Sequence, residues 1–124
     1  MMSYLRASSE FQRVYRTGKR YEGSLMTAFV LPNHLSENRL GVTASRKALG
    51  NAVERNRAKR LLKETFRQRK ELLRELLQKY DWVINAKRKL PSLKVSAALV
   101  EFESLVSRVA QEESKKSVGP KLFG

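Results

Sequence analysis

Several residue types and patterns are missing from this sequence, and each absence excludes a class of protein. With no cysteine, the chain has neither a disulfide framework nor a thiolate metal site. The only histidine, His34, stands in a polar stretch, where a solvated side chain is a better explanation than a catalytic base. No apolar run approaches the roughly 18 to 20 residues that span a bilayer, and the first residues lack the apolar core of a signal peptide. We therefore expect a cytoplasmic protein with no membrane-spanning segment.

Acidic residues are scarce beside basic ones. The chain of 124 residues contains 26 lysines and arginines but only 12 aspartates and glutamates, which gives a formal net charge of +14. This charge makes an isolated protein repel itself, so the composition favours an anionic partner, with nucleic acid ahead of an anionic membrane. The acids are scattered, whereas a metal-dependent nuclease needs them clustered, and no nucleophile elbow or phosphate-binding glycine loop is present. We expect no catalytic residue and no metal site in the polypeptide itself.

Length and hydropathy indicate a single folded domain. Hydrophobic residues make up 41% of the chain, too many for a disordered basic tail. A chain of this length has room for one hydrophobic core. We expect one RNA-binding domain over residues 1–113 and a flexible tail over residues 114–124, which show no periodicity.

Apolar periodicity and capping residues predict an α+β fold with the element order αββαβα. The two strands on either side of residues 32–38 are close enough in sequence to pair as an antiparallel hairpin. The helix that begins near Asn51 carries an apolar stripe as far as Leu77, which fits one long helix or two helices with a break near residues 68–70. The expected elements are a helix over residues 8–17, strands over 21–31 and 39–45, a helix from 51 to 79, a strand over 81–86 and a helix over 96–112.

The helix that follows Asn51 is basic along one side and apolar along the other. At about 100° per residue its apolar positions share one side: Ala58, Leu61, Leu62, Thr65 and Phe66. The opposite side is polar and basic: Asn56, Lys59, Arg60, Lys63 and Arg67. Arg55 and Arg57 project to either side of this face, while Arg46 and Lys47 precede the helix and extend the charge toward its N-terminus.

This basic face has two explanations, a solvated surface or a surface that binds phosphates. Ten lysines and arginines lie between Arg46 and Lys70, where Glu54 and Glu64 are the only acids. Their mutual repulsion requires compensation, which favours binding. Arginine suits bidentate phosphate contacts, and Asn56 could reach a base edge or a ribose 2′-hydroxyl.

Aromatic residues form a second candidate site. Phe11 and Tyr15 are one helical turn apart, Phe29 lies on a strand that could pack beside them, and basic residues are interleaved with all three. Such a pattern resembles a stacking platform for single-stranded nucleic acid, although periodicity alone favours ordinary core packing. Residues 87–89, Lys-Arg-Lys, form a further basic cluster that is either solvated or an additional RNA contact.

The basic helix and several flanking segments resemble the protein subunit of bacterial ribonuclease P. Residues 51–62, Asn-Ala-Val-Glu-Arg-Asn-Arg-Ala-Lys-Arg-Leu-Leu, are similar to that family's Arg-Asn-Arg helix after a glycine-asparagine turn. Residues 11–18, 41–47 and 81–87 resemble the family's first helix, the strand and loop before the motif, and the last strand. The resemblance covers residues 8–109, apart from a poorly defined stretch between Arg69 and Tyr80.

The resemblance carries expectations about the fold. It implies an α/β sandwich similar to the second domain of ribosomal protein S5, in which the basic helix joins two parallel strands. In that family the βαβ crossover is left-handed, whereas general rules favour a right-handed connection.

The resemblance also implies a function. In this family a large RNA subunit carries the active site and the Mg²⁺ ions that remove the 5′ leader from precursor tRNA, and the protein binds the RNA subunit and the leader. No protein partner is implied. Contacts to the RNA subunit would come from Arg46, Lys47, Arg55, Asn56, Arg57, Lys59, Arg60, Lys63 and Arg67. Contacts to the leader would come from Phe11, Tyr15, Arg16 and Phe29. For the three aromatic residues among them, the resemblance favours a stacking role over core packing.

Other functions remain to be tested against this one. A non-catalytic structural RNA-binding protein, of the ribosomal or RNA-chaperone type, would have the same composition. A self-sufficient nuclease is disfavoured by the scattered carboxylates. A basic amphipathic helix on a membrane surface is disfavoured because the apolar stripe of the helix is needed for the core.

Overall fold

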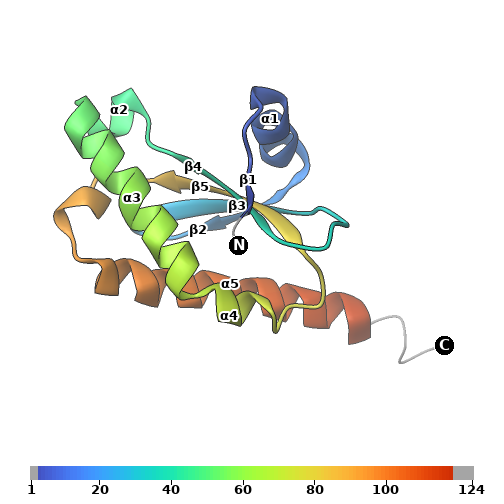
Figure 1. The fold of residues 1–124 in the computed structure, drawn as a ribbon. Helices are drawn as coiled ribbons and strands as arrows, with labels where there is room; N and C mark the ends of the chain where they lie inside the picture. The colour runs from blue at the N-terminus through green and yellow to red at the C-terminus, as the bar shows by residue number, and fades with distance from the viewer. Residues whose placement is uncertain (1–2, 119–124) are drawn as a thin grey trace.

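The computed structural model describes residues 3–118, which form a five-stranded sheet with helices on both faces (Figure 1). Helix α1 lies on one face, and α3 and α5 lie on the other. The predicted α+β class is confirmed. The elements are β1 (Ser3–Tyr4), α1 (Ser8–Thr17), β2 (Lys19–Glu22), β3 (Met26–Pro32), β4 (Arg39–Thr43), α2 (Arg46–Leu49), α3 (Ala52–Gln68), α4 (Lys70–Leu73), β5 (Tyr80–Ala86), the 3-10 helix η1 (Leu90–Ser92) and α5 (Val95–Val118).

The strand order in the sheet is β1-β4-β5-β3-β2. Strand β5 pairs with β3 in antiparallel and with β4 in parallel orientation. The predicted hairpin between the strands at 21–31 and 39–45 is therefore wrong, because β5 lies between β3 and β4. Strand β5 is buried at all but one of its positions, and a strand that is covered on both faces belongs in the centre of a sheet.

Two strands of the sheet are absent from the predicted order αββαβα. Strand β1 has two residues and pairs with β4 through Tyr4 and Leu40. Strand β2 has four residues, of which Tyr21 alone is buried, and pairs with β3 as a hairpin. Both strands are too short to show an alternating pattern, so their pairing depends on the neighbouring strand and not on local sequence.

The parallel pair β4 and β5 is joined through α2 and α3, which forms the predicted βαβ unit. The handedness of this connection stays a prediction. Helix α3 ends at Gln68, and Arg69, with φ −112° and ψ 16°, separates it from α4, so the basic helix is not continuous. The Nε atom of Arg69 lies 2.6 Å from a carboxylate oxygen of Glu103 on α5, which ties the break to the neighbouring helix.

Helix α5 extends beyond its predicted end at residue 112. It continues to Val118 and so includes the first part of the tail expected over residues 114–124. The remainder of that tail lies outside the described residues.

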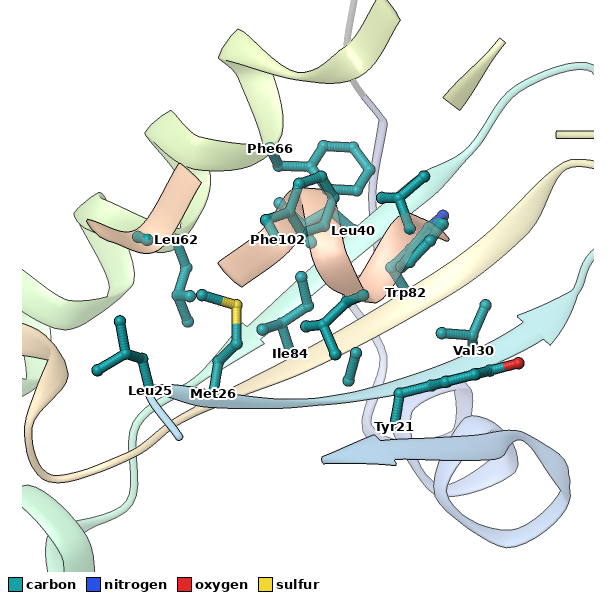
Figure 2. Packing of buried hydrophobic residues seen from close by; sticks show 14 of the residues in the cluster. Tyr21, Leu25, Met26, Val30, Leu40, Leu62, Phe66, Trp82, Ile84 and Phe102 are labelled. Atoms are coloured by element: carbon teal, nitrogen blue, oxygen red, sulfur yellow. The ribbon is translucent and has the colours of Figure 1, made fainter. Parts of the chain in front are cut away.

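The main core lies between the sheet and the helices α3 and α5 (Figure 2). Phe66 of α3, Trp82 of β5 and Phe102 of α5 meet there, with ring centroids 5.7 to 6.1 Å apart. All three are at most 1% exposed. Because one face of α3 is committed to this core, its orientation over the sheet is set and its basic side is directed outward.

The β2–β3 turn is held against α5 by one carboxylate. Glu101 accepts the backbone N–H groups of Ser24, Leu25 and Met26 at 2.8 to 3.0 Å, and the hydroxyl of Ser24 at 2.8 Å. These bonds satisfy backbone donors that the hairpin ladder leaves unpaired. The edge of the sheet is thereby fixed to the helix that covers it.

Helix α1 is anchored to the opposite face by a network of charged groups. Arg39 donates from Nε and Nη2 to the two oxygens of Asp81, at 2.8 and 2.7 Å, and from Nη1 to Glu10 at 2.9 Å. Glu10 also accepts the backbone N–H groups of Arg6 and Ala7 at the start of α1. The network joins β4, β5 and α1, so it determines where α1 lies on the sheet.

Ionisation of Glu10 is expected to stabilise the fold in a pH-dependent manner. The N–H donors of Arg6 and Ala7, with the charge of Arg39, lower the pKa of Glu10 from its ordinary value of 4.5. A carboxyl whose pKa is lowered by folding stabilises the protein above the ordinary value and loses that contribution as the pH falls below it. We therefore expect Glu10→Gln to lower the free energy of unfolding at neutral pH, and the difference from wild type to shrink as the pH falls below 4.5.

Urea unfolding followed by the fluorescence of Trp82, the only tryptophan, measures this difference. Both proteins should be compared at about pH 7 and about pH 3. A difference that is the same at the two pH values would show that the charge of Glu10 makes no contribution.

Candidate nucleic-acid interface

Helix α3 presents the basic side that its sequence predicts. Asn51 caps its N-terminus, because its side-chain oxygen accepts the backbone N–H of Glu54 at 2.8 Å. The buried positions are Ala58, Leu62, Thr65 and Phe66, as predicted for the apolar stripe. The exposed positions are Asn56, Arg57, Arg60, Lys63 and Arg67, while Arg55 and Lys59 are half-buried.

Two of the predicted RNA contacts are engaged within the protein. Arg55 donates from Nη1 to the carbonyl oxygen of Gly50 at 2.6 Å, which fixes its side chain against the turn before α3. Arg67 donates from Nε and Nη2 to Glu64 at 3.0 and 2.5 Å. These bonds from Arg67, with a further one from Gln68, lower the pKa of Glu64 to about 2. The charge of Arg67 is therefore largely neutralised at the C-terminal end of the basic face.

The middle of the basic face has no such compensation. Within the described part of the chain, Arg57, Lys59 and Arg60 have no acidic partner. The Nζ atom of Lys63 lies 5.4 Å from the ring centroid of Tyr4, in a cation–π arrangement that leaves its charge in place. This group of cations repels itself unless an anion binds, which favours a phosphate-binding surface over a merely solvated one.

Two adjoining hollows follow α3 and connect it with the opposite face of the sheet. Both are lined by Lys59 and Lys63. The first also contains Val53, Asn56 and Arg60. The second crosses to β1, β4 and α1, where its lining residues include Tyr4, Arg6, Phe11 and Gly41. The structure thus joins the predicted RNA contacts on α3 to Phe11 of the predicted leader contacts.

The predicted aromatic residues meet on the α1 side of the sheet. The rings of Tyr15 and Phe29 have centroids 4.9 Å apart and an interplanar angle of 84°, an edge-to-face contact. Phe11 lies so close to β4 that a Cβ atom at Gly41 would come within 2.6 Å of its ring. Phe11 and Phe29 are half-buried against a small apolar cluster, whereas Tyr15 is 38% exposed. Arg16 is exposed in the last turn of α1.

Comparison with known proteins connects these surfaces to one family. The sequence model described as Ribonuclease P matches residues 2–110. The ribonuclease P protein component of Caldanaerobacter subterraneus subsp. tengcongensis is 35% identical over 115 residues, which cover 93% of this chain and 96% of that protein. The chain belongs to the ribonuclease P protein family.

Other relatives agree with this membership. The ribonuclease P protein component of Clostridium botulinum strain Loch Maree is 42% identical over 83 residues, which cover 67% of this chain and 72% of that protein. The solved ribonuclease P protein from Thermotoga maritima superposes with a TM-score of 0.73 at 24% identity, over 86% of this chain and 96% of that chain, and so shows the same fold. Ribonuclease P is an endoribonuclease of tRNA 5′ maturation, and the chain is a protein subunit of that enzyme with an RNA partner.

Sequence reasoning missed two residues beside the basic face of this ribonuclease P protein. Tyr4 and Arg6 line the hollow that connects α3 to α1, and Tyr4 lies under the ammonium group of Lys63. Strand β1 places Tyr4 there by pairing with β4, and Arg6 follows two residues later. The only local signal was the sequence Tyr-Leu-Arg near the N-terminus, which is too short to predict a strand.

A polar group on β5 was also missed. Asn85 lies beside the aromatic pair, and its side-chain oxygen accepts hydrogen bonds from the hydroxyls of Tyr15 at 2.8 Å and Thr43 at 2.5 Å. In the sequence Asn85 is, besides Asp81, the only polar side chain of an otherwise apolar buried strand, which is an uncommon position for an amide. That exception to the apolar pattern was the available signal.

The remaining basic residues lie at the end of the sheet where strands β4 and β5 end. Arg46 and Lys47 are exposed on α2, whose first turn is capped by the hydroxyl of Ser45. In the cluster at residues 87–89, Lys87 forms an ion pair with Glu22, while the other two side chains are exposed. Lys87 lowers the pKa of Glu22 from its ordinary value. This end of the sheet therefore combines basic side chains with the acid Glu22.

Metal-binding clusters and membrane-spanning helices are both absent from residues 3–118 of this ribonuclease P protein. No group of three or more histidine, cysteine, aspartate or glutamate side chains in that range is placed to hold a metal ion. No helix in the same range has the length and hydropathy required to cross a membrane.

Proposed function

We propose that the chain acts as a single RNA-binding domain that holds the RNA subunit of ribonuclease P on α3 and the 5′ leader of precursor tRNA on the α1 side of the sheet. The observation that carries this proposal is the hollow lined by Lys59, Lys63 and Phe11, which connects the basic face to the first of the aromatic residues. The surface accommodates two RNA segments that lie side by side.

The proposed contacts to the RNA subunit are electrostatic. The uncompensated cations Arg57, Lys59 and Arg60 supply phosphate contacts, with Lys63 beside them. Arg55 and Arg67 have smaller roles, because their guanidinium groups already bond to Gly50 and Glu64. The other members of the proposed surface are Arg46, Lys47 and Asn56, with Tyr4 and Arg6 added by the structure.

The proposed contacts to the leader are stacking contacts supported by charge. Tyr15 offers an exposed ring beside Phe29, and Phe11 continues the aromatic surface toward α3. Arg16 lies in the same helix and can contact the leader backbone. Stacking on these rings gives affinity for a single strand without requiring a particular sequence.

The cations would also assist the RNA catalyst. The substrate and the RNA subunit are both polyanions, so positive charge between them lowers their repulsion. Ribonucleases of this kind depend on metal ions, and we propose that the RNA subunit and the substrate bind Mg²⁺. Reduced repulsion would allow these ions to bind at lower concentration.

Reconstitution with a bacterial ribonuclease P RNA tests the proposed function. We expect the chain to restore removal of the 5′ leader from precursor tRNA at a Mg²⁺ concentration too low for the RNA alone. The protein by itself should leave the substrate intact. Absence of stimulation would instead support a structural RNA-binding protein, and cleavage by the protein alone would support a self-sufficient nuclease.

The leader contacts are tested separately with Phe29→Leu, which keeps an apolar side chain but removes the ring. We expect the holoenzyme to lose affinity for leader-bearing precursor tRNA and to retain its affinity for mature tRNA. An equal loss for the two RNAs would assign Phe29 to the core alone.

A further inference from the structure

The hydrogen bonds around Asn85 leave its amide group with donors only. An amide oxygen has two lone pairs, and the hydroxyls of Tyr15 and Thr43 occupy both. The amide nitrogen carries two N–H donors, and among the described residues neither has an acceptor. Every buried side-chain nitrogen or oxygen of the described residues has a hydrogen-bond partner. Because the amide nitrogen of Asn85 has none, it is not a buried atom. Asn85 therefore presents accessible N–H groups in an orientation fixed by two neighbours.

The surroundings of Asn85 indicate what these donors meet. Its neighbours across the sheet are Thr27 on β3 and Thr43 on β4, so it lies in a polar row on the α1 side. Tyr15 projects over this row and places its hydroxyl on Asn85. A base stacked on the ring of Tyr15 would have its edge above the amide of Asn85.

The charges around this row lie at its border and not at its centre. Arg20 and Lys87 both form ion pairs with Glu22 on β2, which leaves a net positive charge there. Phosphates of a bound strand are attracted to that border, while its bases turn toward the rings. The donors of Asn85 consequently face a base edge more readily than the backbone.

We propose that Asn85 selects the base of one leader nucleotide by donating a hydrogen bond to a keto oxygen. Uracil O4 and guanine O6 are acceptors, whereas cytosine and adenine carry an amino donor at the equivalent position. An amide that can only donate thus favours uracil or guanine. This inference rests on the proposed function, because it requires the leader to lie on the α1 side of the sheet.

The test uses the holoenzyme reconstituted from this chain and a bacterial ribonuclease P RNA. Affinity is measured for precursor tRNAs in which each leader position in turn carries uracil, guanine, cytosine or adenine. With the wild-type chain we expect one position at which keto bases bind about threefold to tenfold more tightly than amino bases, the range of a single net hydrogen bond.

Asn85→Asp is the decisive variant. A carboxylate still accepts the hydroxyls of Tyr15 and Thr43, but it presents an acceptor where the amide presented a donor. We expect the base preference at that one position to reverse, while preferences elsewhere in the leader are unchanged. A loss that is equal for all four bases, or a wild-type chain without a keto preference at any position, would overturn the proposal.

A second variant and two controls complete the design. Asn85→Leu removes the donors without adding charge, so the keto preference should disappear without reversing, and it decides the question if Asn85→Asp does not fold. Trp82 fluorescence reports folding of each variant. Phe29→Leu serves as the control for leader binding itself: if this variant binds leader-bearing and mature tRNA as wild type does, the proposed function fails, independently of the base preference at Asn85.

Discussion

Replacing Arg57 and Arg60 together with alanine is expected to weaken binding of the chain to a ribonuclease P RNA by at least about a hundredfold at moderate salt, because hydrogen bonds to charged groups are worth about 1.5 to 3 kcal/mol each. Both side chains are exposed and have no acidic partner among the described residues, so the substitutions remove phosphate contacts without disturbing the protein. The logarithmic dependence of affinity on salt should become shallower by roughly 0.7 to 0.9 for each phosphate that is no longer neutralised. Titration of labelled RNA at several salt concentrations measures both quantities.

A matched control removes the same charge from another part of the protein. Lys70 and Arg74 lie in and just after α4, and Arg74 is paired with Glu71 in an exposed ion pair. Replacing both with alanine changes the net charge equally but leaves α3 intact, so only a small loss of affinity is expected. If the two double variants lose the same affinity, the effect comes from net charge and α3 is not the docking surface.

Replacing Asp81 with asparagine is expected to lower the free energy of unfolding by about 3 kcal/mol, the scale for breaking one partner of a buried ion pair. The side chain of Asp81 is 2% exposed and receives two hydrogen bonds from Arg39 and one from Asn33. When Asp81 loses its charge, Glu10 is the carboxylate partner that remains for the partly buried guanidinium of Arg39. Urea unfolding followed by Trp82 fluorescence measures the change.

Glu71→Gln is the appropriate comparison for Asp81→Asn. It breaks the ion pair between Glu71 and Arg74, whose side chains are 66% and 73% exposed, respectively. Ion pairs this exposed contribute little to stability. We expect a much smaller effect from this variant. A loss for Asp81→Asn no larger than that for Glu71→Gln would show that the network at α1 is not a main source of stability.

The cations on α3 and the buried network of Asp81 support different parts of the same surface. Arg57 and Arg60 are exposed, so their removal affects RNA binding alone, whereas Asp81 is buried and acts through the position of α1. Because α1 carries Phe11 and Tyr15, a displaced α1 would move the aromatic residues as well. The network of Asp81 therefore supports the proposed leader surface without contacting it.

Sequence patterns predicted the features that repeat along one helix or one strand. The spacing of apolar residues identified the buried side of α3, and with it the exposed side that carries Arg57, Arg60 and Lys63. The apolar run at residues 82–84 of β5 indicated a buried strand. These predictions succeeded because a helix or strand with one committed face has its other positions determined by geometry alone.

Predictions that required knowledge of distant partners were less successful. The hairpin was expected from the short separation of two strands, but β5, which comes later in the chain, lies between them. Strand β1 could not be predicted, because its two residues are defined by pairing with β4.

The sequence by itself determined that this protein carries a large excess of positive charge, that one helix presents much of it on a single side, and that the chain resembles ribonuclease P proteins. Only the tertiary structure decided that Lys59, Lys63 and Phe11 share one hollow and that Tyr15 and Thr43 orient Asn85. The physical reason is the range of the interactions. Periodicity and charge are properties of neighbouring residues, whereas strand order and side-chain hydrogen bonds depend on residues that folding brings together from distant parts of the chain.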